Sequence, residues 1–213
     1  MPPKSIAEYF QLDVMLPFTP RYNVAPTQSV PAISPGGDGV GRVGAVVRWG
    51  LLPSWTKEPK SSALLINARA ETIHEKPSFR TPFARKRCLI PALGFYEWKH
   101  SGRGKRPYFF RLLSDEPMAF AGIRDEWRRG NTVLESCAIL TVGANDLMKP
   151  VHNRMPVIVK PTDFDRWLDT TITGRAPLES ILVPYGADEM TAYPVSDRVN
   201  KASADDPGLI EPL

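Results

Sequence analysis

The sequence predicts an α+β protein, a single domain over residues 1–213 in which a curved, mostly antiparallel, barrel-like β-sheet is flanked by short helices. Three observations lead to this class. Most apolar segments are short and rich in β-branched and aromatic residues, as strands are. Prolines number 22 of 213, about 10% against a usual share of roughly 5%, and they lie dispersed between those segments. No repeat and no linker-like tract divides the chain.

Three short helices are expected. The first covers residues 4–16, where apolar residues recur at helical spacing. The second covers 78–87, with Pro82 either in its first turn or breaking it, because proline lacks the N–H that a helix interior uses. The third covers 162–170, where Thr162 is a suitable N-cap.

Strands are expected where apolar runs carry β-branched and aromatic residues, at 44–50, 88–92, 94–98, 107–113, 118–123 and 134–142. Ahead of them, the segment 21–35 is punctuated by prolines, and 36–39 is predicted to be a glycine-rich turn. The segment between Lys99 and Arg106 contains two glycines and suits a hairpin loop.

Several classes of protein are excluded. No apolar run approaches the roughly 20 residues of a membrane span, and no signal peptide opens the chain. Cys88 and Cys137 form neither a disulfide framework nor a zinc site, and the three histidines show no metal-ligand spacing. We therefore expect a cytoplasmic protein that needs no membrane, metal or cofactor.

Positive charge is concentrated in one stretch. The formal net charge of the chain is +4, but residues 80–106 alone carry eight basic residues and one acid, Glu97. Such an excess attracts polyanions, above all nucleic acid. A solvated helix end followed by a solvated hairpin tip is the alternative, and charge alone does not decide between them.

Two titratable residues are candidates for proton transfer. Glu97 lies among aromatic residues in Gly94–Trp98, where lost solvation would raise its pKa and suit it to general acid–base catalysis. An edge-strand glutamate that faces water is the alternative. His152 lies in a loop between two prolines, and its ordinary pKa suits a proton shuttle, although a lone histidine is more often structural.

Five further residues are candidates for contacts with substrate. Asn67 follows a short apolar run and suits donation to a developing oxyanion, while Arg69 suits a phosphate. Asparagine at a strand end is also an ordinary turn residue. Trp49 and Trp55, like Trp98, have faces on which unpaired bases stack, although core packing is the usual role of tryptophan in strands.

Six motifs together are more specific than any one of them. In order and approximate spacing they resemble the SRAP family, the SOS response-associated peptidases, over nearly the whole chain. The motifs are RYNVAP at 21–26, RWGLLPSW at 48–55, INARAET at 66–72, RCLIP at 87–91, GFYEW at 94–98 and HNRMP at 152–156.

The resemblance implies recognition of abasic sites in single-stranded DNA by a nucleoid-associated, monomeric protein. It further implies a covalent crosslink, in which the α-amine of an amino-terminal cysteine forms an imine with the sugar aldehyde and its thiol closes a thiazolidine. Activity as a self-processing peptidase with lyase-like chemistry belongs to the same expectation. The residues carried over fall into two groups. Asn67, Glu97 and His152 are expected to be catalytic, and Arg69, Arg154, Trp49, Trp55, Arg85, Lys99 and Arg106 to bind DNA.

The chain opens differently from the family. It begins Met-Pro-Pro-Lys, where the resemblance implies Met-Cys-Gly-Arg on a short strand. Cys88 and Cys137 cannot substitute, because their nitrogens are locked in peptide bonds. Three alternatives follow: a misplaced start or shortened sequence, a non-covalent binder of single-stranded or abasic DNA, or an iminium formed by the α-amine of Pro2. The chain is also expected to be less stable than a version with the strand restored.

Overall fold

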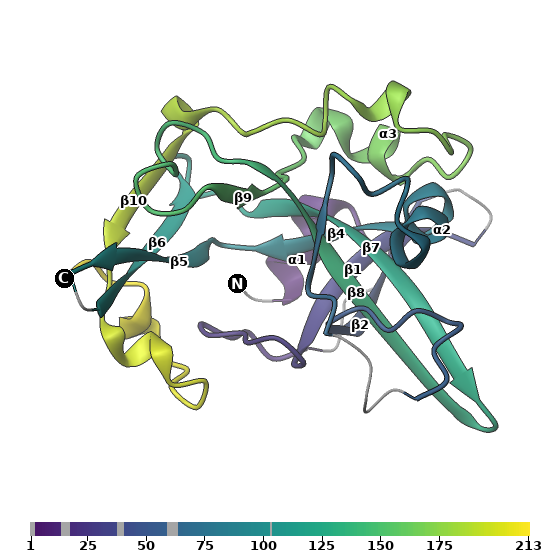
Figure 1. The fold of residues 1–213 in the computed structure, drawn as a ribbon, viewed down its shortest axis with the longest axis horizontal. Coiled ribbons are helices and arrows are strands. Elements are labelled where there is room, and N and C mark those ends of the chain that lie inside the picture. The colour runs from purple at the N-terminus through teal and green to yellow at the C-terminus, as the bar shows by residue number, and fades with distance from the viewer. Residues whose placement is uncertain (1–2, 14–17, 38–40, 59–63, 103) are drawn as a thin grey trace.

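The computed structural model describes residues 3–13, 18–37, 41–58, 64–102 and 104–213 (Figure 1). Within these ranges the α-helices are α1 (Pro3–Phe10), α2 (Pro77–Arg85) and α3 (Phe164–Leu168). The strands are β1 (Ser29–Pro35), β2 (Arg42–Trp49), β3 (Asn67–Arg69), β4 (Arg87–Ala92), β5 (Phe95–Ser101), β6 (Gly104–Leu112), β7 (Met118–Arg129), β8 (Thr132–Gly143), β9 (Arg154–Pro156) and β10 (Met190–Pro194). Short 3-10 helices are η1 (Pro161–Asp163), η2 (Ala176–Leu178), η3 (Ala187–Glu189), η4 (Asp197–Asn200) and η5 (Pro207–Leu209).

Strands β2, β1, β4, β7 and β8 close a mixed barrel. Neighbours in that order pair antiparallel, and β8 returns to β2 through a parallel pair. On the other flank of β8, β3 pairs in parallel and β9 antiparallel. The predicted α+β class with a curved, mostly antiparallel sheet is therefore confirmed.

The barrel strands are buried on both faces. Ile33, Leu89, Ile123 and Leu140 are fully buried side chains on the face that also carries Arg87, whereas Cys88 and Cys137 are buried on the opposite face. At one side α1 packs on α3 through stacked Phe10 and Phe164 rings, whose centroids are 5.2 Å apart. No helix within the described ranges is long and apolar enough to cross a membrane.

A second sheet, in the order β10, β6, β5, lies beside the barrel. Phe109, on one of its faces, packs with Val195 and Val199 of the carboxy-terminal segment. On the opposite face, the ring of Phe95 meets that of Phe120 on barrel strand β7, with centroids 5.9 Å apart. The sheet therefore stands between the barrel and the carboxy-terminal segment, at the end of the molecule opposite α2 (Figure 1).

Arg87, part of the basic stretch, is only 1% exposed. Its guanidinium donates to the carbonyl oxygen of Phe83 at 2.7 Å, and to those of Trp167 and Asp169. It therefore joins the ends of α2 and α3, whose last carbonyls have no partner inside the helix. Burial lowers the pKa of Arg87 to about 10, so the side chain stays charged at neutral pH.

Some local predictions were wrong. Residues 21–35 contain β1 despite Pro31 and Pro35, and 190–194 form β10, which was not predicted. The hairpin loop is shorter than expected, because Lys99 and Arg106 pair within the strands. Its residue 103, like part of the predicted turn at 36–39, lies outside the described residues.

The helices also differ in detail. Pro82 lies inside α2, and Pro77 occupies its first turn instead. The N-cap of α3 is Asp163, whose side chain makes no capping bond, so Thr162 does not cap this helix. The first helix ends at Phe10, and residues 14–16 of its predicted span are outside the described residues.

Candidate functional site

A cleft of about 1120 Å³ lies between the barrel and the second sheet. It opens where β1 and β4 separate, since the two strands share one register pair, Ile33 with Leu89. Beyond that pair, Pro31 of β1 and Pro91 of β4 both line the cleft, and proline has no N–H to donate to a ladder. The barrel wall is therefore open at this point.

Asn67 and Arg69 reach the cleft from β3. This short strand pairs in parallel with β8, and its middle residue, Ala68, is buried against the core. Because side chains alternate along a strand, Asn67 and Arg69 share the opposite, exposed side. Both line the cleft, as the predicted roles of an amide donor and a phosphate-binding arginine require.

Glu97 and His152 meet in the same cleft from distant parts of the chain. The Oε1 atom of Glu97 lies 3.9 Å from the Nδ1 atom of His152. Glu97 sits on the face of β5 that turns toward the barrel, two residues after Phe95, and its side chain is 28% exposed. His152 ends a turn in which its backbone N–H donates to Met148 O at 3.0 Å. The tertiary structure thus brings Asn67, Glu97 and His152 to one cavity.

The surroundings of Glu97 favour its protonated form. Burial raises the pKa of the Glu97 carboxyl above its ordinary value near 4.5, while the charge of His152, the backbone N–H of Trp98 and the charge of Lys105 act against that rise. A carboxyl group of this kind can exchange protons closer to neutral pH than an exposed glutamate does. The 3.9 Å contact with an imidazole provides a second group for the same exchange.

Replacing Glu97 with glutamine is expected to raise the melting temperature by a few degrees at pH 8 and to change it little at pH 4. A carboxyl whose folded-state pKa is raised contributes stability below its unfolded pKa and loses that contribution as the pH rises through the folded value. Glutamine stays neutral at both pH values. Thermal unfolding at the two pH values measures this difference, and an equal change at both would contradict it.

His152 is oriented by the backbone of Arg154. Its Nδ1 lies 3.1 Å from the carbonyl oxygen and 3.2 Å from the N–H of that residue, and the tautomer decides which contact is the hydrogen bond. The Arg154 guanidinium lines the cleft but is bound to the Glu71 carboxylate at 2.6 and 2.9 Å. A DNA phosphate would therefore have to compete with Glu71 for this arginine.

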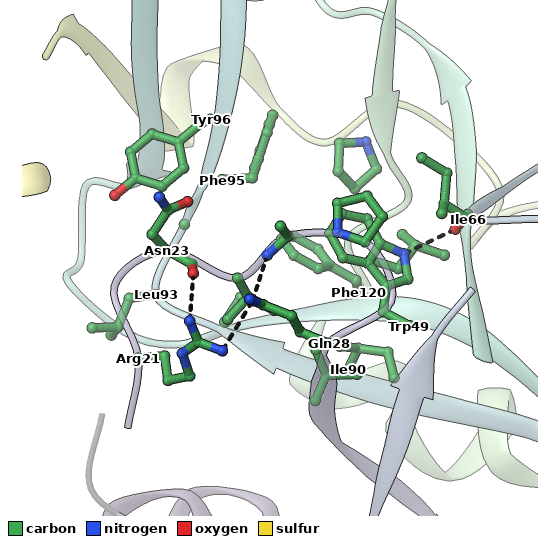
Figure 2. A pocket seen from close by; sticks show the side chains of 18 of the residues that line it. Arg21, Asn23, Gln28, Trp49, Ile66, Ile90, Leu93, Phe95, Tyr96 and Phe120 are labelled. Atoms are coloured by element: carbon green, nitrogen blue, oxygen red, sulfur yellow. Dashed lines mark hydrogen bonds between the residues drawn. The ribbon is translucent and has the colours of Figure 1, made fainter. Parts of the chain in front are cut away.

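The three tryptophans considered for base stacking differ in their position relative to the cleft. Trp49 lines the cleft, and its Nε1 donates to the carbonyl oxygen of Ile66 at 3.0 Å (Figure 2). Trp98 also lines it and donates to Asn200 Oδ1 at 2.7 Å. Trp55 is 65% exposed on a turn and does not line the cleft. Of the two tryptophans predicted to bind DNA, the structure places only Trp49 at the cavity wall.

The basic stretch 80–106 is not one surface. Lys99 lies two residues beyond Glu97 on the same face of β5, and Arg106 is directly opposite it on β6. Like charges in directly opposed positions repel, so this pair favours an anion between or above them. Arg85 is on α2, at the other end of the molecule and outside the cleft lining (Figure 1). The basic residues of this stretch are therefore divided into separate groups, because Arg87 is buried and α2 lies apart from β5 (Figure 1).

The sequence did not predict one hydrogen-bond network, which lies at the rim of the cleft. Asn23 is 6% exposed, and its Nδ2 donates to the carbonyl oxygens of Val199, Lys201 and Ala204, each at 3.1 Å. The Asp205 carboxylate accepts from the backbone N–H of Asn23 at 3.0 Å, and also from Tyr22 and Arg21. Arg21 donates in turn to the side chain of Gln28 at 2.9 Å (Figure 2). The RYNVAP motif was the only local signal of this network. The partners of Asn23 in the carboxy-terminal segment lie more than 170 positions further along the chain.

The two cysteine thiols of the chain have low reactivity. Cys88 and Cys137 are fully buried in the barrel. Burial raises the pKa of the Cys88 thiol to about 12 and that of Cys137 well above its ordinary value. A thiolate is the reactive form, so neither residue is suited to nucleophilic chemistry.

The fold and the cleft define a mixed-barrel protein with a half-buried acid–base pair beside exposed cationic side chains. The chain belongs to the SRAP family: the family described as SOS response associated peptidase (SRAP) matches residues 1–202. It is 45% identical over 212 residues to abasic site processing protein YoqW of Bacillus subtilis, covering 97% of this chain and 93% of that protein.

More distant proteins agree with this membership. Abasic site processing protein HMCES of Gallus gallus is 32% identical over 227 residues, which cover 92% of this chain and 67% of that protein. A crystal structure of a protein from Bordetella bronchiseptica superposes with a TM-score of 0.80 at 26% identity, covering 92% of this chain and 96% of that one.

Proposed function

We propose that this protein binds single-stranded DNA at abasic sites and processes them in the cleft, with Glu97 and His152 as the acid–base pair and Asn67 as a polar donor. The observation that carries the proposal is the convergence of these three side chains in one cavity. It is supported by the 45% identity to a protein named for abasic site processing.

The chemistry requires proton transfer at two oxygens. An abasic sugar is closed as a hemiacetal, and opening it takes a proton from the anomeric hydroxyl and delivers one to the ring oxygen. Two adjacent titratable groups, one giving a proton and the other taking one, can do both, and Glu97 and His152 are two such groups 3.9 Å apart. The amide of Asn67 would then hydrogen-bond the developing carbonyl oxygen.

In the covalent form of the proposal, an α-amine adds to the aldehyde, water leaves to give an imine, and a thiol on the same residue closes a thiazolidine. The resemblance assigns both groups to an amino-terminal cysteine. Cys88 and Cys137 do not serve, because they are buried and mid-chain. The second candidate function is a module that binds abasic DNA in the same cleft without a covalent bond. The Pro2 of the third alternative lies outside the described residues.

One gel experiment tests the function and separates its forms. The protein is incubated with a single-stranded oligonucleotide that carries an abasic site, with a tetrahydrofuran analogue that cannot open to an aldehyde, and with an undamaged strand. A band that survives denaturation on the abasic strand alone indicates the thiazolidine, and one that requires borohydride indicates an imine. A native shift stronger for both abasic strands indicates binding only. Equal binding to all three strands would contradict the proposal.

Replacing Arg69 with glutamine is expected to weaken binding of single-stranded DNA and to reduce the slope of log K against log salt by about 0.7, the share of one phosphate contact. Arg69 is exposed and lines the cleft, so it can approach the backbone without breaking the core. Arg85→Gln is the matched control, because it removes the same charge from α2, away from the cleft. Fluorescence anisotropy at several salt concentrations measures both, and equal slopes for the two variants would contradict the assignment.

A further inference from the structure

Glu71 makes a contact that the proposed function leaves unexplained. Its two carboxylate oxygens accept from Nη1 and Nη2 of Arg154, at 2.6 and 2.9 Å. This end-on, two-bond geometry is the strongest form of an arginine–carboxylate contact. The hydrogen bonds from Arg154 also hold the pKa of the Glu71 carboxyl below its ordinary value, so the pair is ionised throughout the neutral range.

Arg154 is held on its other side as well. Its Nη2 donates to the carbonyl and hydroxyl oxygens of Thr141 on β8, and its Nε is buried with no hydrogen-bond partner among the described residues. The side chain is therefore enclosed rather than extended into solvent. The side chain of Glu71, by contrast, is 49% exposed. This residue lies two positions beyond Arg69, the last residue of strand β3.

The contact links strand β3, which carries Asn67, to strand β9, which begins two residues after His152. Strands β3 and β9 both pair with β8, at Arg69↔Thr141 and Arg154↔Gly143. The Glu71–Arg154 pair thus reaches across β8 from the end of β3, which presents Asn67, to the start of β9. The backbone of Arg154 in turn lies 3.1 and 3.2 Å from His152 Nδ1.

We propose that Glu71 is a positioning residue: by fixing Arg154, it sets the orientation of the His152 ring toward Glu97 and its distance from Asn67. This inference rests on the proposed function for its consequence in processing, but not for its structural content. Arg69 also lies near Glu71, and Lys105 near Glu97, so each of the two acids has a further cation nearby, and Glu71 is the acid bonded to Arg154.

The test reads the His152 ring without DNA. Histidine ring nitrogen chemical shifts report the tautomer and the hydrogen bonds of each imidazole, and this chain has three histidines. In Glu71→Gln, which keeps the side-chain size, the ring nitrogen signals of His152 are expected to move toward those of a free, averaging imidazole. The signals of His100, an exposed residue on the face of β5 opposite to Glu97, are expected to stay in place. Glu75→Gln removes the same charge from an exposed position on the following turn and is the matched control.

The second readout is processing of abasic DNA under saturating protein. Glu71→Gln is expected to lower the rate about tenfold or more, as misplacement of a reacting group does, while DNA affinity stays the same or increases, because Glu71 no longer competes with phosphate for Arg154. His152 signals identical to wild type in Glu71→Gln would overturn the inference whatever the rate. If wild-type protein processes no abasic DNA, the proposed function fails, while the nitrogen signals still decide the role of Glu71.

Discussion

Glu97→Gln is expected to slow processing of an abasic site by about 100-fold or more, the usual effect of losing a general acid–base group. Glutamine fills the same volume but can neither take up nor release a proton. Burial raises the pKa of the Glu97 carboxyl, which moves its proton exchange closer to neutral pH than that of an exposed glutamate. DNA affinity should stay within about twofold, because the cationic side chains proposed to bind phosphate are unchanged.

Single-turnover rates on an abasic oligonucleotide measure this effect, with anisotropy for affinity. His152→Gln should show a loss of the same order, and the double variant should lose little more, because the two groups act as one pair 3.9 Å apart. Glu75→Gln, on an exposed turn, is the control for the charge change. Wild-type rates in Glu97→Gln would exclude it from the chemistry.

Arg87→Met is expected to lower the melting temperature by about 6–12 °C, which corresponds to about 3 kcal/mol in a domain of this size. Methionine keeps the apolar stem but leaves the carbonyl oxygens of Phe83, Trp167 and Asp169 without their donor. Each buried acceptor without a partner costs about 1–3 kcal/mol. The variant also loses the contacts of the guanidinium with the Phe83 and Trp167 rings.

Arg85→Met provides the matched control, because it removes the same charge two residues earlier on an exposed position of α2. Its melting temperature should change by less than about 2 °C, as expected for a surface substitution. Differential scanning calorimetry compares the two variants. Similar melting temperatures for the two variants would contradict a role for Arg87 in joining α2 to α3.

The strands were largely predictable because their signal is local. Segments such as 88–92 and 118–123 carry β-branched and aromatic residues, and the structure extends them into β4 and β7. β1 was missed because Pro31 and Pro35 indicate loops, whereas this strand borders the opening of the barrel. β10 was missed because it is five residues long and belongs to a sheet whose other strands lie far earlier in the chain.

The sequence by itself determined the α+β class, the family and the residue types of the candidate site, because strand propensity and short motifs are properties of neighbouring residues. Only the tertiary structure decided which charged side chains are exposed, unpaired and near the cleft, and therefore able to contact a ligand. It buried Arg87, bound Arg154 to Glu71, separated Arg85 from Lys99, and brought Glu97 within 3.9 Å of His152. Burial and pairing depend on contacts between segments tens of residues apart, here 55 positions for Glu97 and His152, and no local pattern encodes them.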